Sequence, residues 1–151
     1  MSKELAAFRL FSKDEFQLWL ARNEDLREEL EHLMGGSKKL GVDTASLDAL
    51  EAFLLARFAD PASALRLDSR GIVDAASRQV GLVLMLNVDG AEWAINLDDK
   101  KRIYYQLPLI RFENGDEECP LSMVTACLDR RTGDYMRTLV ENYAEDFGSA
   151  Q

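Results

Sequence analysis

The chain has few of the side chains from which most catalytic and metal sites are built. It contains one histidine and two cysteines among 151 residues. One histidine, His32, cannot supply three imidazole ligands to a zinc ion, and Cys119 and Cys127 lack the C-x-x-C spacing of redox and zinc motifs. We therefore predict no catalytic residue, no metal site and no bound cofactor.

The two cysteines are also too few for a disulfide framework. They lie eight residues apart across a predicted helix, where a rise of about 1.5 Å per residue separates them by about 12 Å along the axis. A disulfide allows a Cα separation of about 7 Å at most. We expect two free thiols and, from them, a protein of the reducing cytoplasm.

Long apolar runs and nucleotide-binding loops are missing as well. No stretch reaches the ~20 apolar residues that span a bilayer, and the start of the chain shows no secretion signal, so we expect no membrane segment. Gly35-Gly36 follows a predicted helix and precedes no buried strand, unlike a phosphate-binding loop. Asp98-Asp99 lacks the alternating oxygen ligands and the glycine of a calcium loop.

What the chain does have is the composition of a folded, acidic domain. Apolar residues make up 47% and charged residues 30%, as in ordinary globular proteins. The length predicts a single domain over residues 1–151, with residues 1–36 as an N-terminal helical segment. The net charge of −9 would repel a phosphate backbone and attract a basic protein, although it would also serve solubility alone. We therefore predict no nucleic-acid partner.

Apolar residues at three- and four-residue spacing predict helices on both sides of a central stretch. In the N-terminal segment, Ser12 and Glu15 fit a capping box, and a break near Asn23 divides the pattern. Further helices are expected from Thr44 or Ser46 to just before Asp60-Pro61, from Pro120 to Arg131, and from Asp134 onward.

The central stretch, residues 68–112, predicts a buried helix followed by a hairpin. The helix is expected to end near Gly90, where the spacing changes to two and predicts antiparallel strands over residues 92–97 and 103–112. Both faces of the second strand are apolar, so we expect it to be covered on both sides or to contact a partner. Pro108 restricts it to a sheet edge or a bulge. The predicted core is Val80, Val83, Leu84, Ile95 and Leu107. Together these elements predict an α+β fold in which N- and C-terminal helices pack around a small antiparallel sheet.

The loop after the second strand is the predicted binding surface. Asn114-Gly115 indicates a turn, and the acidic run that follows it indicates an exposed loop. Loops held by rigid elements are where binding residues concentrate. The candidate partner-binding residues are the four loop acids and two aromatic residues of the hairpin face: Glu113, Asp116, Glu117, Glu118, Tyr104 and Phe112.

Several segments together resemble a group of small bacterial proteins, some of which are similar to immunity partners of secreted toxins. The segments are Leu50–Phe58, Asp74–Gly81, Glu92–Leu97, Cys119–Leu121 and Leu128–Tyr135. The resemblance covers residues 47–143 and includes no motif of known chemistry. It implies a bacterial cytoplasmic protein whose work is to bind another protein.

Two classes of function follow. In the first, the protein is an immunity or regulatory protein that neutralises a partner with a basic cleft. In the second, it is a small-molecule-binding or enzymatic domain with a pocket between the hairpin and the helices. The sequence leaves the oligomeric state open.

Overall fold

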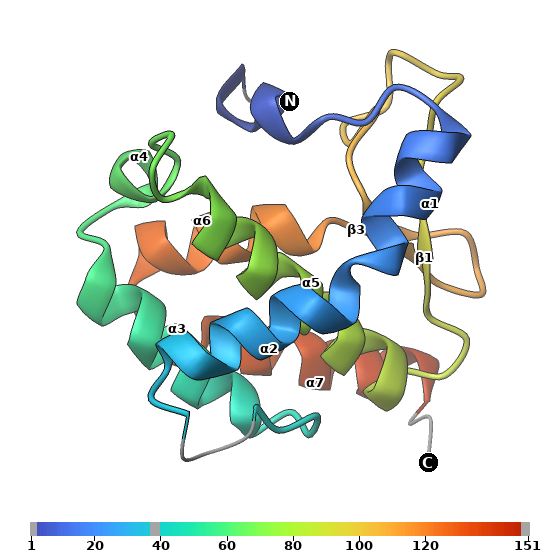
Figure 1. Cartoon of the computed structure of the whole chain (residues 1–151). Coiled ribbons are helices and arrows are strands. Elements are labelled where there is room, and N and C mark those ends of the chain that lie inside the picture. The colour runs from blue at the N-terminus through green and yellow to red at the C-terminus, as the bar shows by residue number, and fades with distance from the viewer. Residues whose placement is uncertain (1–2, 37–39, 149–151) are drawn as a thin grey trace.

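The computed structural model of the chain describes residues 3–36 and 40–148, and it shows helices around a small sheet (Figure 1). The helices in these ranges are η1 (Lys3–Phe8, a 3-10 helix), α1 (Lys13–Ala21), α2 (Asn23–Leu33), α3 (Ser46–Arg57), α4 (Pro61–Ala64), α5 (Arg70–Asn87), α6 (Pro120–Arg130) and α7 (Tyr135–Phe147). The strands are β1 (Glu92–Ala94), β2 (Leu109–Arg111) and β3 (Glu117–Glu118). This arrangement confirms the predicted α+β fold. No helix in the described part of the chain is long and apolar enough to cross a bilayer.

Helix α5 is the centre of the fold. It contacts α2, α4, α6, α7, β1 and β2 (Figure 1). Three of its predicted core residues, Val80, Val83 and Leu84, have no exposed surface. Leu107, from the loop before β2, is also fully buried, whereas Ile95 is only partly buried and lies outside the core. The prediction for Ile95 is wrong because β1 ends at Ala94, so alternation no longer fixes which way this side chain faces.

The close approach of the sheet to α5 depends on a glycine. A Cβ atom built on Gly81 would lie 2.1 Å from Cζ2 of Trp93, which is far inside van der Waals contact. The indole of Trp93 in turn meets the ring of Trp19 edge to face, with centroids 4.8 Å apart. Gly81 therefore lets β1 and α1 pack closely on the same part of α5.

The sheet in the described residues has shorter strands than predicted, and it contains three strands instead of two. Its order is β1-β2-β3, all antiparallel, with Trp93 opposite Ile110 and Ile110 opposite Glu118. Residues 95–108 form a long loop because Pro108 cannot donate to a ladder and the side chain of Asn96 accepts the backbone N–H groups of Asp98 and Asp99. The expected exposed loop at 116–118 is wrong in part, since Glu117 and Glu118 form the third strand.

The second predicted strand is nevertheless covered on both faces where it forms. Leu109 and Ile110, which point to opposite sides of β2, are both fully buried. This agrees with its apolar sequence on both faces. Glu117 and Glu118 therefore lie in a strand that pairs with β2 and not in a free loop.

The N-terminal segment has the predicted break and half of the predicted capping box, because the Glu15 carboxylate accepts from Phe11 and not from Ser12, the N-cap residue. The Ser12 side chain accepts the N–H of Glu15 at 3.1 Å, and the Glu15 carboxylate accepts the N–H of Phe11 at 2.6 Å. Helices α1 and α2 are separated at Arg22. Buried Arg78 of α5 holds this junction, since its guanidinium lies 3.9 Å from the Trp19 ring and donates to Asn23 Oδ1 at 2.8 Å.

Two charged side chains, buried Glu51 and exposed Arg131, join α3 to the C-terminal helices. Glu51 has no exposed surface, and its carboxylate accepts the N–H groups of Tyr135 and Met136 at 3.1 and 3.0 Å, at the start of α7. Arg131, in the left-handed conformation at the end of α6, donates to the carbonyl oxygens of Leu55 and Phe58 at the end of α3. Each charge satisfies backbone groups that a helix end leaves unpaired.

Candidate functional site

Strand β3 directs its two glutamates to opposite faces of the sheet. Glu117 pairs directly with Arg111 of β2, and Glu118 pairs with Ile110. Successive side chains of a strand point to opposite sides, so Glu118 shares the face of the buried Ile110. The two adjacent acids therefore have different surroundings.

Glu117 is held by two arginines, Arg102 and Arg111. Its Oε1 accepts from Arg102 at 3.1 Å, and its Oε2 accepts from Arg111 at 2.9 Å. The side chain keeps 9% of its surface exposed. The charge of Glu117 is thus already balanced by ion pairs within the chain, and a basic partner would have to compete with both arginines for this carboxylate.

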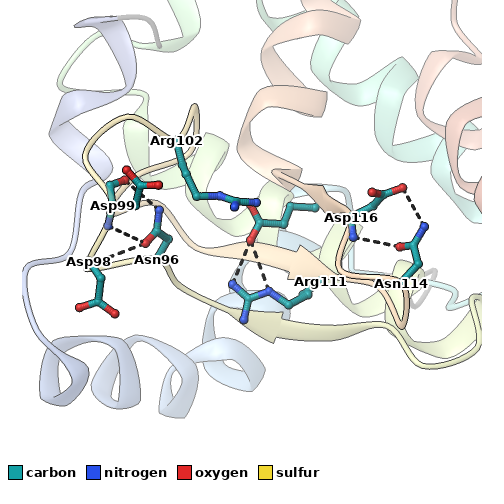
Figure 2. Close-up of polar contacts among 8 residues, drawn as sticks. Asn96, Asp98, Asp99, Arg102, Arg111, Asn114 and Asp116 are labelled. Carbon is teal, nitrogen blue, oxygen red and sulfur yellow. Dashed lines mark hydrogen bonds and ion pairs between the residues drawn. The ribbon is translucent and has the colours of Figure 1, made fainter.

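The turn before β3 carries the two exposed acids of the predicted surface, Glu113 and Asp116. Asn114 accepts the N–H of Asp116 at 2.9 Å and donates to its carboxylate at 3.0 Å (Figure 2). Gly115 has a φ of +90°, which fits the predicted Asn-Gly turn. The Asn114 side chain thus bridges the turn through two hydrogen bonds, and Glu113 and Asp116 are both exposed.

Glu118 lies on the inner face among aromatic rings. Its Oε1 accepts from the Tyr143 hydroxyl of α7 at 2.8 Å, and its Oε2 accepts from the backbone N–H of Cys119 at 3.0 Å. Burial raises the pKa of Glu118 above its ordinary value, and the bonds from Tyr143 and Cys119 offset the increase only in part.

The two aromatic candidate residues, Phe112 and Tyr104, are not exposed either. Phe112 is 2% exposed and stacks on Tyr143 and Phe147, with ring centroids 4.5 and 5.0 Å away. Tyr104 is half-buried next to Glu118, and burial raises the pKa of its hydroxyl to about 12. Of the six predicted partner-binding residues, the structure leaves Glu113 and Asp116 fully on the outside.

A larger group of unpaired acids lies on α2. Glu24, Asp25, Glu28 and Glu29 are all exposed, and none of them forms an ion pair within residues 3–36 and 40–148. The opposite side of the helix is buried through Leu26 and Leu30. Nothing in the sequence pattern distinguishes these acids from a solubilising surface.

The acidic face of α2 also borders a hollow. Asp25, Glu28, Glu29, His32 and Leu33 line a shallow, open depression along the helix. His32 is exposed. The apolar residue Leu33, which is 47% exposed, is part of its lining.

Between the hairpin and the helices there is little room for a ligand. The cavity lined there by Phe8, Trp19, Asp74, Ser77, Trp93, Pro108, Pro120 and Leu121 has a volume of about 10 Å³. That is enough for about one water molecule. Among the residues whose structure is described, no three His, Cys, Asp or Glu side chains gather in a way that could hold a metal ion.

Both cysteines are free, as predicted, and both are buried. Burial raises the pKa of each thiol to about 12. A thiol with such a pKa is almost entirely protonated at neutral pH and is a poor nucleophile. Cys119 precedes α6 and Cys127 lies within it, where both serve as small core side chains.

Comparison of the chain with protein-family models, with curated proteins and with solved structures finds no match.

Proposed function

We propose that this chain is a protein-binding module that engages a basic surface of another protein, and that the acidic face of α2 is the principal contact. In the immunity or regulatory role that the sequence resemblance implies, the bound partner would be neutralised. The exposed pair Glu113 and Asp116 forms a second acidic contact on a separate part of the molecule, since β3 and α2 lie apart (Figure 1).

One observation carries this proposal: α2 exposes four acids that have no basic partner in the described ranges. Glu24 and Asp25 lie in its first turn, where the helix dipole favours negative charge, but Glu28 and Glu29 repel them. Glu24 and Glu28 are four residues apart, as are Asp25 and Glu29, and like charges at this spacing cost about 0.2–0.5 kcal/mol per pair. None of the four acids is paired with a base in the described ranges. A basic partner would remove this repulsion and would be attracted from a distance.

The competing function, a small-molecule or enzymatic domain, receives no support from the cavity between hairpin and helices. Its volume of about 10 Å³ is far below the roughly 300–1,000 Å³ of typical ligand pockets. The groups that line it, apart from Asp74 and Ser77, are apolar.

The test compares two variants with the same net charge. The α2 variant E24Q/D25N/E28Q/E29Q removes four exposed acids from one face, and the control variant E92Q/D129N/E145Q/D146N removes four exposed acids from elsewhere. Both carry a net charge of −5, which is −9 plus 4. Each protein is immobilised and exposed to a lysate of its source organism at low and high ionic strength, and the captured proteins are quantified by mass spectrometry.

We expect a basic protein that binds the wild type and the control but not the α2 variant. Its association rate, measured with the purified partner, should fall with added salt because exposed charges are screened beyond about 10 Å at 0.1 M salt. Capture that is equal for both variants, or an association rate indifferent to salt, would show that the acidic face of α2 is not the contact.

A further inference from the structure

Asn114 is the one asparagine of the chain that is followed by a glycine. The other asparagines precede larger residues: they are Asn23, Asn87, Asn96 and Asn142. Asparagine is a thermally labile residue, and a glycine after it leaves the backbone nitrogen unhindered by a side chain. Asn114 and Gly115 are both exposed, so water reaches the pair. The turn between β2 and β3 therefore offers a site of covalent modification, apart from any binding role of its acids.

A second turn of the chain repeats the side-chain arrangement of Asn114 without the glycine (Figure 2). The Oδ1 atom of Asn114 accepts the N–H of Asp116, two residues further along, at 2.9 Å. The Oδ1 atom of Asn96 accepts the N–H of Asp98, also two residues further along, at 3.1 Å. Asn96 is half-buried and is followed by a leucine, whereas Asn114 is exposed and is followed by a glycine. Asn96 thus provides a comparison within the same molecule.

The reaction that the Asn114-Gly115 pair allows is loss of ammonia from the side-chain amide. A hydroxide ion takes the proton of the Gly115 N–H, the nitrogen forms a bond to Cγ of Asn114, and the Cγ–Nδ2 bond breaks. The Nδ2 group takes a proton from water and leaves as ammonia, which restores the hydroxide ion. A further water molecule then opens the cyclic imide at either of its carbonyl carbons. The product at position 114 is aspartate or isoaspartate.

Two hydrogen bonds of the folded turn act on this reaction in opposite directions. Negative charge develops on Oδ1 of Asn114 during the attack, and the N–H of Asp116 already donates to that oxygen. The attacking nitrogen of Gly115, however, donates to the Phe112 carbonyl at 2.9 Å and must first be released from it. The net contribution of such a bond corresponds to about two- to tenfold in an equilibrium constant, so its release slows the reaction by no more than about tenfold.

The product cannot keep the bridge that Asn114 forms across the turn. Its Nδ2 group donates to the Asp116 carboxylate at 3.0 Å, whereas an aspartate at position 114 has no proton to donate and carries a like charge. Isoaspartate also adds a carbon atom to the main chain that links β2 to β3. Strand β3 spans Glu117–Glu118 alone, so its pairing with β2 can compensate little for a displaced turn.

We propose that Asn114 is an intramolecular modification site: in the folded protein its side-chain amide is lost to attack by the Gly115 nitrogen, and the resulting carboxylate loosens the turn between β2 and β3. The net charge then changes from −9 to −10, which is −9 minus 1. The added charge lies beside Glu113 and Asp116 in the sequence and not on α2, so the modification requires no partner and leaves the principal contact unchanged.

The test ages the wild-type protein at neutral pH and physiological temperature and maps its peptides by mass spectrometry. Replacement of the amide by a carboxyl raises the mass of a peptide by one unit. We expect this gain at Asn114, at a rate within about tenfold of the rate in the chain unfolded by guanidinium chloride, and no gain at Asn96 over the same period. Chromatography should separate an aspartate and an isoaspartate product. Asn114→Gln, whose longer side chain disfavours the same ring closure, should show no gain at this position.

The effect on the turn is measured by amide hydrogen exchange at Phe112, whose N–H donates to the Asp116 carbonyl at 2.9 Å. We expect faster exchange at this amide in Asn114→Asp and in the isolated isoaspartate form than in wild type, and equal exchange at residues 80–84 of α5. A mass gain confined to the unfolded chain would show that the turn protects Asn114. Exchange at Phe112 that is no faster in Asn114→Asp would show that the turn does not depend on the amide. Either result would overturn the proposal.

Discussion

At the scale of single residues, several positions are set by contacts that the sequence pattern does not reveal. Gly81 is the clearest case, because α5 carries a second glycine, Gly71, in a different setting. A Cβ at Gly81 would enter the Trp93 ring, whereas a Cβ at Gly71 would meet no atom within 4 Å. The same residue type in the same helix is therefore a packing requirement at one position and a source of backbone freedom at the other.

Replacing Gly81 by alanine should destabilise the protein by about 1–3 kcal/mol, the usual cost of overpacking a well-packed site. The matched change Gly71→Ala should be neutral or stabilising by up to about 1 kcal/mol, since alanine is the better helix former. Urea unfolding of both variants measures the difference. Equal stabilities would show that Trp93 moves aside at little cost.

The cysteines provide a second prediction at this scale. With each pKa raised to about 12 by burial, Cys119 and Cys127 should react with an alkylating reagent only when the chain opens. Mass spectrometry should show slow labelling of the native protein at pH 8 and two adducts after denaturation without a reductant. Rapid labelling of the native protein would contradict their burial.

At the scale of elements, the sequence was most informative about helices and least informative about the sheet. Periodic apolar residues, the Ser12 cap and first-turn Pro120 located the helices well. The strands were predicted too long because apolar residues on both faces of 103–112 resemble a strand, while the Asn96 turn that forms the loop depends on a side-chain contact.

Contacts between distant residues, which the sequence pattern does not reveal, also explain why the candidate site could be predicted only in part. Acidic residues at 113–118 are visible in the sequence, and Glu113 and Asp116 are exposed. The pairing of Glu117 with Arg111 requires β3 and its register, and a two-residue strand leaves no periodicity to detect. The burial of Phe112 requires α7 to pack on the sheet, which is a long-range contact.

Helix α5 should dominate the stability of the fold. Leu84 has no exposed surface, so Leu84→Ala should cost about 2–5 kcal/mol of unfolding free energy. Leu86, two residues further along the same helix, is 45% exposed, and Leu86→Ala should cost much less. Thermal or urea unfolding of the two variants gives the comparison. An unchanged melting temperature for Leu84→Ala would mean that α5 is peripheral.

The junction of α3 with α7 depends on one buried carboxylate. Glu51→Ala would leave the N–H groups of Tyr135 and Met136 without acceptors, at about 1–3 kcal/mol for a buried group. Asp48→Asn, on the same helix, alters a half-exposed pair with Arg137 and should cost less than about 1 kcal/mol. Faster hydrogen exchange at the start of α7 in the Glu51 variant, but not in the Asp48 variant, is the expected result.

At the scale of the whole molecule, excess negative charge opposes the compact state. The chain carries 27 acids against 18 bases, and the exposed acids of α2 have no basic partner in the described part of the chain. Self-repulsion of this kind is screened by salt, whereas the burial of Leu84 and its neighbours is not weakened by it. Repulsion among the acids thus lowers the stability of the free protein. A basic partner would reduce this repulsion.

This predicts that moderate sodium chloride stabilises the free protein at neutral pH. Glu28→Gln together with Glu29→Gln changes the net charge from −9 to −7 and should both raise stability at low salt and reduce the gain from added salt. The control, Asp98→Asn with Lys101→Gln, removes one exposed charge of each sign that forms no ion pair in the described ranges and keeps the net charge at −9, so its salt dependence should match that of wild type. Urea midpoints across a salt series measure all three proteins. If salt lowers the midpoint of the wild type, the ion pairs of Glu117, Asp48 and Asp74 outweigh the repulsion among the unpaired acids, and the charge on α2 is not a cost that a partner could relieve.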